Sequence, residues 1–158
     1  MMLRVMIIRY TQFQIGIEHI RLRVEGTHKR NKTSMRTHLI QVTPELEVIY
    51  DVGQSAQENH DMIDASAPTD LWFHVSGRPS CHVIAHIPEE VLDMPSKARR
   101  VALRKITTQG AVLCKRFSKY ASEKRLSMDV ARVSDVEKSS VPGSVVLAKA
   151  SEAQTVII

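Results

Sequence analysis

Aromatic residues are scarce in this sequence, at 4% of 158 residues, which excludes a long base-stacking platform of the kind that binds single strands. Cysteine is rarer still, since Cys81 and Cys114 are the only two and neither belongs to a CxxC motif. Their spacing argues against a zinc ribbon or a secreted disulfide framework and favours a reducing, intracellular setting. No run of about 18 apolar residues occurs, so we expect no membrane partner.

Motifs of nucleophilic and phosphate-transfer catalysis are also missing. The sequence contains neither GxSxG nor the phosphate-cradling GxxxxGK[ST]. Strand alternation places Cys81 on an apolar face, where a cysteine behaves as a small hydrophobe rather than as a reactive thiolate. We therefore expect a protein that is not an enzyme and that has no cofactor.

Charge is present in blocks, within a net charge of +5. From Glu45 to Asp93 there are ten acids and a single base, Arg78, whereas Lys97 to Arg125 holds ten bases and one acid, Glu123. Such a basic block is typical of proteins that bind phosphate backbones, although a solvated helix face has the same composition. The candidates that we select from it for nucleic-acid binding are Arg99, Arg100, Arg104 and Lys105.

The first 34 residues differ from the rest of the chain. They are rich in arginine and poor in acids, which suggests either an organelle transit peptide or a gene-model extension ahead of a start at Met35. We expect a cytoplasmic protein, or a mitochondrial one if the segment is a transit peptide. The folded domain is predicted to span residues 36–158.

Hydrophobic periodicity predicts a single α+β domain with a mixed or antiparallel sheet, a central β-hairpin and two main helices. The expected strands outside the hairpin are Leu39–Val42, Val48–Val52, Met128–Val133, Ser144–Ala148 and Thr155–Ile158. The expected helices are Ala56–Ser66 and Ile106–Tyr120, in the second of which Gly110 costs about 1 kcal/mol relative to alanine.

The first helix has a clear start signal. Ser55 is followed three residues later by Glu58, the spacing of a capping box, and Pro68 ends the helix. The predicted inward stripe of this helix consists of Ala56, Asn59, Ile63 and Ala67.

A β-hairpin is predicted from Leu71–Val75 and Cys81–Ile87, joined by a five-residue loop that contains Arg78 and Ser80. Because side chains alternate along a strand, one face is wholly apolar. The apolar face carries Leu71, Phe73, Val75, Cys81, Val83, Ala85 and Ile87. The opposite face carries Trp72, His74, His82, Ile84 and His86, and the loop length sets Trp72 opposite Ile84.

The histidine face allows several interpretations. The imidazoles of His74, His82 and His86 are potential metal ligands, but no carboxylate alternates onto that strand face. We therefore expect no metal site. The His74/His82 pair is a potential general acid–base pair, for which Asp70 at the start of the strand is the nearby partner carboxylate. The face is either a half-exposed, hydrogen-bonded surface or a ligand-contacting one, on which Trp72 and the imidazoles stack on bases.

Three stretches together resemble the signature of the NFACT-R domain family. They are Gly53-Gln-Ser-Ala-Gln-Glu-Asn59, Pro68-Thr-Asp-Leu-Trp-Phe-His-Val75 and Pro79-Ser-Cys-His-Val83. The resemblance extends more weakly to Lys138 and Gly143 and covers residues 36–158, although the serine in Pro79–Val83 lies one position earlier than in the family pattern.

The resemblance implies an RNA-binding module that acts on tRNA or the large ribosomal subunit, with a link to ribosome-associated quality control. Large family members carry further domains for which a chain of this length has no room, so the likeness is to the small stand-alone branch, one member of which senses DNA. The residues implied for binding or structure are Asn59, Asp70, Trp72, His74, Pro79, Ser80, His82, Lys138 and Gly143.

The sequence thus favours a non-enzymatic RNA-binding module over three alternatives. One is a structural or assembly component of a ribonucleoprotein particle, and another is a DNA-binding member of the same family. The third is a small hydrolase or metal enzyme that uses the histidines.

Overall fold

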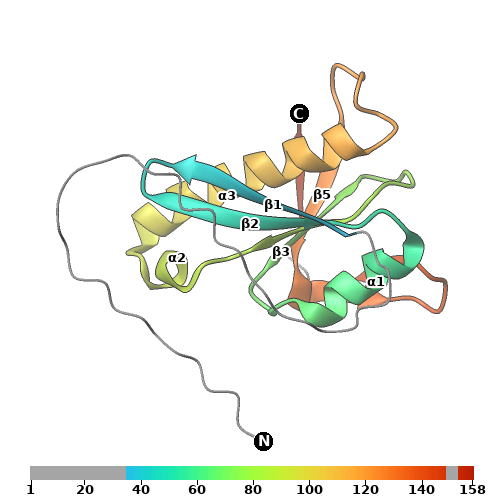
Figure 1. The fold of residues 1–158 in the computed structure, drawn as a ribbon, viewed down its shortest axis with the longest axis horizontal. Coiled ribbons are helices and arrows are strands. Elements are labelled where there is room, and N and C mark those ends of the chain that lie inside the picture. The colour runs from blue at the N-terminus through green and yellow to red at the C-terminus, as the bar shows by residue number, and fades with distance from the viewer. Residues whose placement is uncertain (1–34, 149–152) are drawn as a thin grey trace, which may run out of the picture. The chain divides into compact units, whose positions relative to one another are not determined.

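The computed structural model of the chain describes residues 35–148 and 153–158. In these residues a six-stranded antiparallel sheet has the order β1-β2-β4-β3-β5-β8 (Figure 1). Its strands are β1 (Arg36–Thr43), β2 (Leu46–Val52), β3 (Leu71–Val75), β4 (Val83–His86), β5 (Ser127–Arg132) and β8 (Gln154–Ile157). A small second sheet pairs β6 (Val136–Lys138) with β7 (Val145–Leu147). The predicted segment 1–34 lies outside the described residues.

Three α-helices accompany the sheets, and the α+β class is confirmed. They are α1 (Ala56–Ala65), α2 (Glu89–Asp93) and α3 (Ser96–Phe117). The long helix α3 packs on one face of the sheet, while α1 and the β6–β7 sheet cover part of the other face (Figure 1). None of the helices in the described part of the chain is long and apolar enough to cross a membrane.

The helix α3 begins ten residues before the predicted start at Ile106. Pro95 stands at its N-cap, where a proline is tolerated because no intrahelical N–H is lost, and Ser96 follows as the first helical residue. The first half of α3 is rich in exposed bases, which leave only Ala102 as a fully buried side chain before Ile106. The apolar stripe was therefore too sparse in this half for the sequence to predict a helix.

Gly110 has a packing role in α3. A Cβ atom at this position would lie 2.4 Å from the ring of Phe73, closer than real contacts allow. The glycine therefore lets α3 approach β3 closely, which offsets the cost of about 1 kcal/mol that glycine carries in a helix.

The predicted apolar face of the hairpin is confirmed. Phe73, Val75, Val83 and Ala85 have no measurable exposure and belong to the main core under α3. Across that core the hydroxyl of Tyr50 donates to the carbonyl oxygen of Ile106 at 3.1 Å, which ties β2 to α3. This side of the sheet is filled almost entirely by apolar side chains.

The register of the hairpin is also confirmed, because Trp72 pairs with Ile84. The second strand, however, begins at Val83 instead of Cys81. The N–H of His82 donates to Asn59 Oδ1 and its carbonyl oxygen accepts from the N–H of Gly53. These bonds commit the backbone of His82 to α1 and the end of β2, and the ladder with β3 starts at Val83, two residues later than predicted.

Helix α1 starts as predicted. The Ser55 hydroxyl accepts from the N–H of Glu58 at 3.2 Å. The predicted stripe was only half right, since Asn59 and Ile63 are buried but Ala56 and Ala67 are exposed. Met62, rather than either alanine, completes the buried face.

Candidate functional site

A groove between α3 and the β5–β8 edge of the sheet gathers four arginines. Its volume is about 930 Å³, and its basic lining residues are Arg99, Arg100, Arg104 and Arg132. Hydroxyl groups from Ser96, Thr107, Thr108 and Ser134 also line it. Asp135 is the one acidic residue among the lining residues described. We call this feature the arginine groove.

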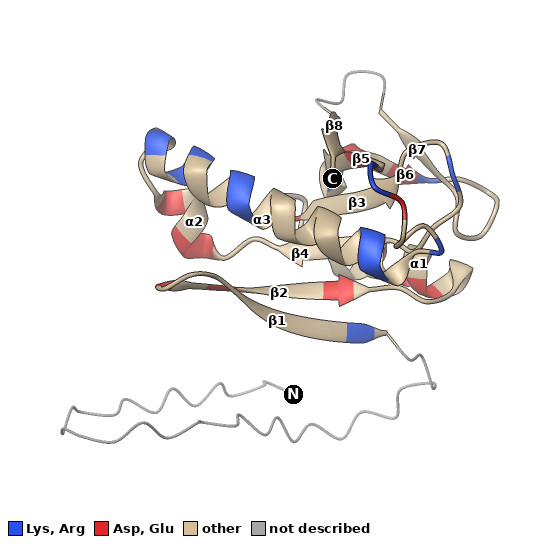
Figure 2. Cartoon of the chain, turned by 90° about the horizontal axis from the view of Figure 1, so that it is seen from above, with Lys and Arg blue, Asp and Glu red and all other residues tan. Residues whose placement is uncertain are grey.

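Most of these guanidinium groups are unpaired. Among the described residues, Arg100, Arg104 and Arg132 form no ion pair, and all three are exposed. Arg99 is half-buried and donates to the carbonyl oxygen of Leu92 at 2.9 Å, which fastens α2 to α3. Figure 2 shows basic residues recurring along α3, with acidic ones on α2. The groove therefore presents exposed positive charge.

Two of the predictions for this block need adjustment. Lys105 is exposed on α3 but does not line the groove. Arg132 lines it and was missed, because it ends β5 and lies outside the block that ends at Arg125. Only the pairing of Leu71 with Arg132 in the sheet places Arg132 across from α3.

A second hollow gathers residues that carry the NFACT-R resemblance. It has a volume of about 580 Å³, and its lining includes Asn59, His74, Pro79, Ser80 and Gly143. These residues come from α1, β3, the hairpin loop and the turn before β7. We call it the motif pocket.

Gly53 and Asn59 form one unit of this pocket. A Cβ atom on Gly53 would lie 2.3 Å from Asn59 Oδ1, the atom that accepts from the N–H of His82. Asn59 is buried, and the bond from the N–H of His82 to its side-chain amide oxygen joins α1 to the hairpin. The glycine and asparagine six residues apart thus have a structural explanation.

Gly143 forms part of the pocket wall for a similar reason. Its backbone has φ of +78°, a region that favours glycine. A Cβ atom there would also lie 2.8 Å from the Cβ of Ala56. The turn before β7 can therefore lie directly against the first residue of α1.

Behind the pocket, three rings pack together. The Trp72 ring stacks on His74 with centroids 5.5 Å apart, and His82 meets both edge-on at 5.1 and 5.3 Å. Trp72 and His82 are each 1% exposed, whereas His74 is half-buried and lines the pocket. The expectation that all three contact a ligand is therefore corrected: α1 and β6 cover Trp72, and only His74 faces a cavity.

Burial also sets the charge of this ring cluster. It lowers the pKa of His82 to about 3, and the neighbouring His74 acts in the same direction. Burial likewise lowers the pKa of His74, against an opposing effect of Asp129. Both imidazoles are thus neutral at pH 7. Within the described residues, Trp72 Nε1 and His82 Nδ1 are buried without a hydrogen-bond partner, which is uncommon in native proteins.

Two hairpin-loop residues are engaged within the protein. Arg78 forms a two-pronged ion pair with Glu123 at 2.8 and 2.9 Å and lies over the ring of Tyr120. Ser80 Oγ accepts from the N–H of Val75 and donates to the carbonyl oxygen of Cys81. The guanidinium of Arg78, a predicted binding residue, is thus already paired with a carboxylate at the surface.

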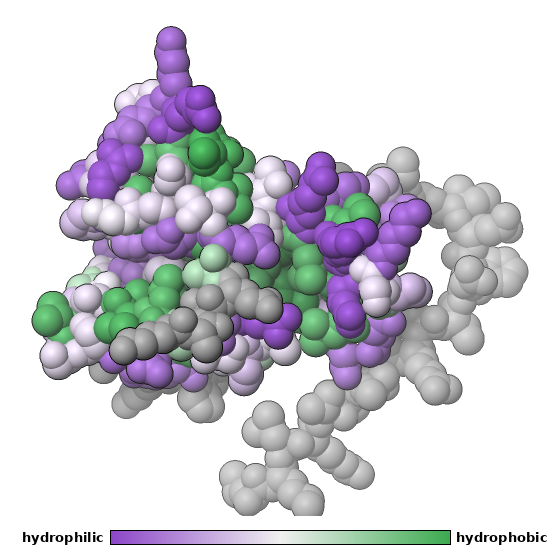
Figure 3. All heavy atoms as spheres, turned by 180° about the vertical axis from the view of Figure 1, so that it is seen from behind, coloured by the Kyte–Doolittle hydropathy of each residue, from purple (hydrophilic) through white to green (hydrophobic). Residues whose placement is uncertain are grey.

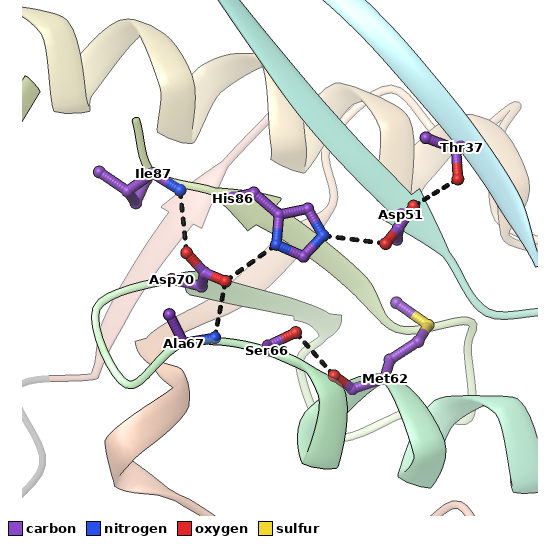
Figure 4. A network of polar contacts seen from close by, with 8 residues as sticks. All are labelled: Thr37, Asp51, Met62, Ser66, Ala67, Asp70, His86 and Ile87. Carbon is purple, nitrogen blue, oxygen red and sulfur yellow. Dashed lines mark hydrogen bonds and ion pairs between the residues drawn. The ribbon is translucent and has the colours of Figure 1, made fainter. Parts of the chain in front are cut away.

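Asp70 belongs to a separate network that holds the hairpin together. Its carboxylate accepts from the N–H of Ala67 and of Ile87, and His86 bridges Asp70 and Asp51 at 2.9 Å on each side (Figure 4). Hydrogen bonds to the two carboxylates raise the pKa of His86 to about 9. This histidine is thus a cation that joins three strand ends.

The pKa values of the two carboxyl groups in this network are lowered, whereas that of His86 is raised. Burial acts to raise the pKa of Asp70, but the hydrogen bonds from His86, Ile87 and Ala67 outweigh it and hold the pKa below its usual value. The pKa of Asp51 is lowered by the same balance, with Thr37 as a further donor. The position of Asp70 in the motif therefore has a structural role.

The remaining binding candidate, Lys138, lies at the surface, whereas the two cysteines lie in or beside the core. Lys138 on β6 forms an exposed ion pair with Asp64 on α1. Cys81 and Cys114 are free thiols, each in contact with the other's carbonyl oxygen. In residues 35–148 and 153–158 no group of three histidine, cysteine or carboxylate side chains is arranged so that it could hold a metal ion.

Some apolar side chains also reach the surface, singly or in pairs. Figure 3 shows green patches separated by hydrophilic side chains on the face opposite to that of Figure 1. Leu39 and Ile49, which pair across β1 and β2, are 62% and 45% exposed. Scattered exposure of this kind is ordinary for a folded domain.

Comparison with known proteins extends the account of the fold. No protein-family model and no curated protein matches this chain. Among solved structures, the chain is similar to the C-terminal part of the fibronectin/fibrinogen-binding protein from Streptococcus suis, with 23% sequence identity and a TM-score of 0.60. The similarity covers 84% of this chain and 48% of that chain, so this chain spans about half the length of its structural neighbour. The likeness supports a shared α+β fold.

Proposed function

We propose that this chain is a non-enzymatic RNA-binding module that holds the phosphate backbone of RNA in the arginine groove. The observation that carries the proposal is the convergence of Arg99, Arg100, Arg104 and Arg132 on one groove. Two of the groove's walls come from segments about 30 residues apart in the chain, so the fold concentrates this charge beyond what the sequence block provides.

The chemistry of the groove suits phosphate. A guanidinium group presents a planar fork of donors that matches two phosphate oxygens, and it stays charged at any physiological pH. The hydroxyls of Ser96 and Thr107 in the lining add neutral donors of the type that commonly contacts phosphate and ribose. The hydroxyls of Thr108 and Ser134 donate within the protein, to a backbone carbonyl oxygen and to the Asp135 carboxylate. An enzymatic role has less support, because His82 is buried and His86 is bonded to two carboxylates that hold the hairpin together.

The choice of RNA over DNA rests on the NFACT-R resemblance, which implies tRNA or the large ribosomal subunit as the partner. A DNA-binding member of the same family is the competing interpretation of the same groove. The structural neighbour, at 23% identity, is named for binding fibronectin and fibrinogen. These two proteins are therefore included as alternative ligands in the binding experiment below.

Charge reversal tests the proposal. We expect Arg100→Glu combined with Arg104→Glu to weaken tRNA binding at least a hundredfold, because two favourable phosphate interactions become repulsive. The slope of log K against log salt should become shallower by about 0.7–0.9 for each phosphate that the variant no longer neutralises. Filter binding or fluorescence anisotropy over a salt series measures both quantities.

A matched control separates the groove from net charge. Lys119→Glu with Lys124→Glu changes the charge equally, and both exposed lysines lie beyond the C-terminal end of α3, outside the groove lining. The control should lose far less affinity than the groove variant. Equal losses in both variants would mean that only diffuse charge is at work. Binding to fibronectin or fibrinogen, with none to RNA, would replace the proposal outright.

The alternative of a permanent ribonucleoprotein component makes a different prediction. Such a protein sediments with its particle in moderate salt, because its binding does not rest mainly on exposed phosphate contacts. A module that uses the arginine groove dissociates as salt rises, since the counterions displaced on binding return. Sucrose-gradient sedimentation at two salt concentrations distinguishes these alternatives.

A further inference from the structure

We propose that the motif pocket receives a single unpaired nucleobase, so that the domain distinguishes RNA that has a base outside the helix. This inference rests on the RNA-binding function proposed above. It adds a pocket that contacts a base to a groove that contacts the phosphate backbone. The volume of about 580 Å³ falls within the range of about 300–1,000 Å³ that is common for small-molecule pockets.

The end of α1 that borders the pocket is unsuited to a phosphate. Helix N-termini often bind anions through free N–H groups. Here the Ser55 hydroxyl accepts from the N–H of Glu58, and the Glu58 carboxyl group accepts from the N–H of Gln54 at 2.7 Å. A phosphate at this place would lie beside the buried Glu58 carboxyl group and find the N–H groups of Gln54 and Glu58 already bonded. This end of the pocket therefore favours a neutral occupant.

The walls suit a flat ring. Pro79, Phe117 and Pro142 contribute apolar surfaces, and His74 contributes an imidazole ring. At the rim, the Arg36 guanidinium lies over the Phe117 ring, 5.5 Å from its centroid. Proteins bind unstacked bases through aromatic and guanidinium planes of this kind, while a cation at the rim can meet the attached phosphate.

The polar groups of the pocket fit the edge of a base. His74 is held in place by ring contacts with Trp72 and His82. Because burial lowers its pKa, the neutral imidazole offers one donor and one acceptor rather than a positive charge. A nucleobase edge presents the complementary pattern of donors and acceptors. The rigid support of His74 keeps this contact in a fixed direction.

Two RNA duplexes of equal length test the inference, one fully paired and one with a single bulged nucleotide. The wild-type chain should bind the bulged RNA roughly tenfold more tightly, the usual value of one base-stacking contact. His74→Gln and the exposed-wall variant Pro142→Ser should each bring this affinity ratio close to one. Equal binding of the two RNAs by the wild-type chain would overturn the inference.

The ratio of the affinities for bulged and fully paired RNA distinguishes a failure of this inference from a failure of the proposed function. Arg100→Glu with Arg104→Glu should weaken binding of both RNAs and leave the ratio intact. If that variant removed the ratio as well, the base would be read in the arginine groove and not in the motif pocket. A circular-dichroism melting curve for each variant confirms that it is folded.

Nucleoside monophosphates test the pocket even if no RNA binds. In an amide NMR titration with AMP, GMP, CMP and UMP, at least one should shift the signals of Gly53, Asn59 and Gly143. Ribose 5-phosphate, which lacks the base, should leave these signals in place. Failure of all four nucleotides to shift them, or shifts confined to the arginine groove, would contradict a base-binding pocket.

Discussion

The two faces of the β3–β4 hairpin are built in different ways. Toward α3, Phe73, Val75 and Val83 are completely buried among apolar neighbours. Toward α1, the hairpin buries Trp72 and Ile84, and beside them lie the buried polar residues Asn59, Asp70 and His82. The first face depends on volume and shape, whereas the second also requires specific hydrogen-bond partners. We therefore expect the face toward α1 to tolerate fewer substitutions than the face toward α3.

The largest expected effect tests whether Trp72 belongs to the core. Trp72→Ala should destabilise the domain by about 3–5 kcal/mol, because it removes a completely buried aromatic ring and leaves a cavity between the sheet and α1. Urea denaturation followed by circular dichroism measures this loss. Val101→Ala is the control, since Val101 is 54% exposed on α3 and its truncation should cost less than about 0.5 kcal/mol.

A near-normal stability for Trp72→Ala, accompanied by weakened RNA binding, would contradict this account. It would mean that the face toward α1 opens in solution and contacts the ligand directly. The comparison between the two hairpin faces would then fail.

The second prediction concerns pH, because His86 and His82 act in opposite directions. The pKa of His86 is raised to about 9, so its contribution is fully present below the usual value of about 6.5 and is lost as pH rises through 9. The pKa of His82 is lowered to about 3, so the unfolded chain binds the extra proton and stability falls as pH drops below about 6.5. Stability should therefore be greatest near neutral pH.

Melting temperatures from pH 5 to pH 10 check this prediction. The wild-type chain should lose on the order of 1–2 kcal/mol on the alkaline side, after allowance for the partial exposure of His86. His86→Gln should be less stable at pH 7 and show a flatter alkaline branch, since the titrating group is gone. Parallel alkaline branches in the two proteins would show that His86 is not charged in the folded state.

The smallest expected effect is at the edge of the second face. Lys138 pairs with Asp64 in an exposed position, so Lys138→Ala should cost less than about 1 kcal/mol in thermal denaturation. The same variant should leave tRNA affinity within about threefold, because the lysine lies outside the arginine groove. A tenfold loss of affinity would restore Lys138 to the set of binding residues that the sequence suggested.

Features of the fold that depend on neighbouring residues could be predicted from the sequence. The capping residue Ser55, the apolar alternation of Leu71–Val75 and the pairing of Trp72 with Ile84 each follow from local spacing, and all three are confirmed. The loop bonds of His82 could not be foreseen, because their partners Gly53 and Asn59 belong to other elements.

The candidate site depends on distant parts of the chain, and there the sequence was a weaker guide. The alternation correctly separated Trp72 from Phe73, but nothing local showed that α1 and β6 cover the face of Trp72. Arg132 was overlooked for the same reason, since only the sheet brings it across from Arg104. The resemblance selected the motif residues Asn59, His74 and Gly143 together but gave no arrangement of them in space. The structure brings them to one pocket.

The most direct test of RNA binding compares tRNA with duplex DNA of equal charge, over a salt series that includes physiological ionic strength. The account predicts that the wild-type chain retains a clear preference for tRNA at physiological salt and that reversing Arg100 and Arg104 removes most of its affinity. Equal and steeply salt-sensitive binding to both nucleic acids, or no dependence on these two arginines, would contradict it.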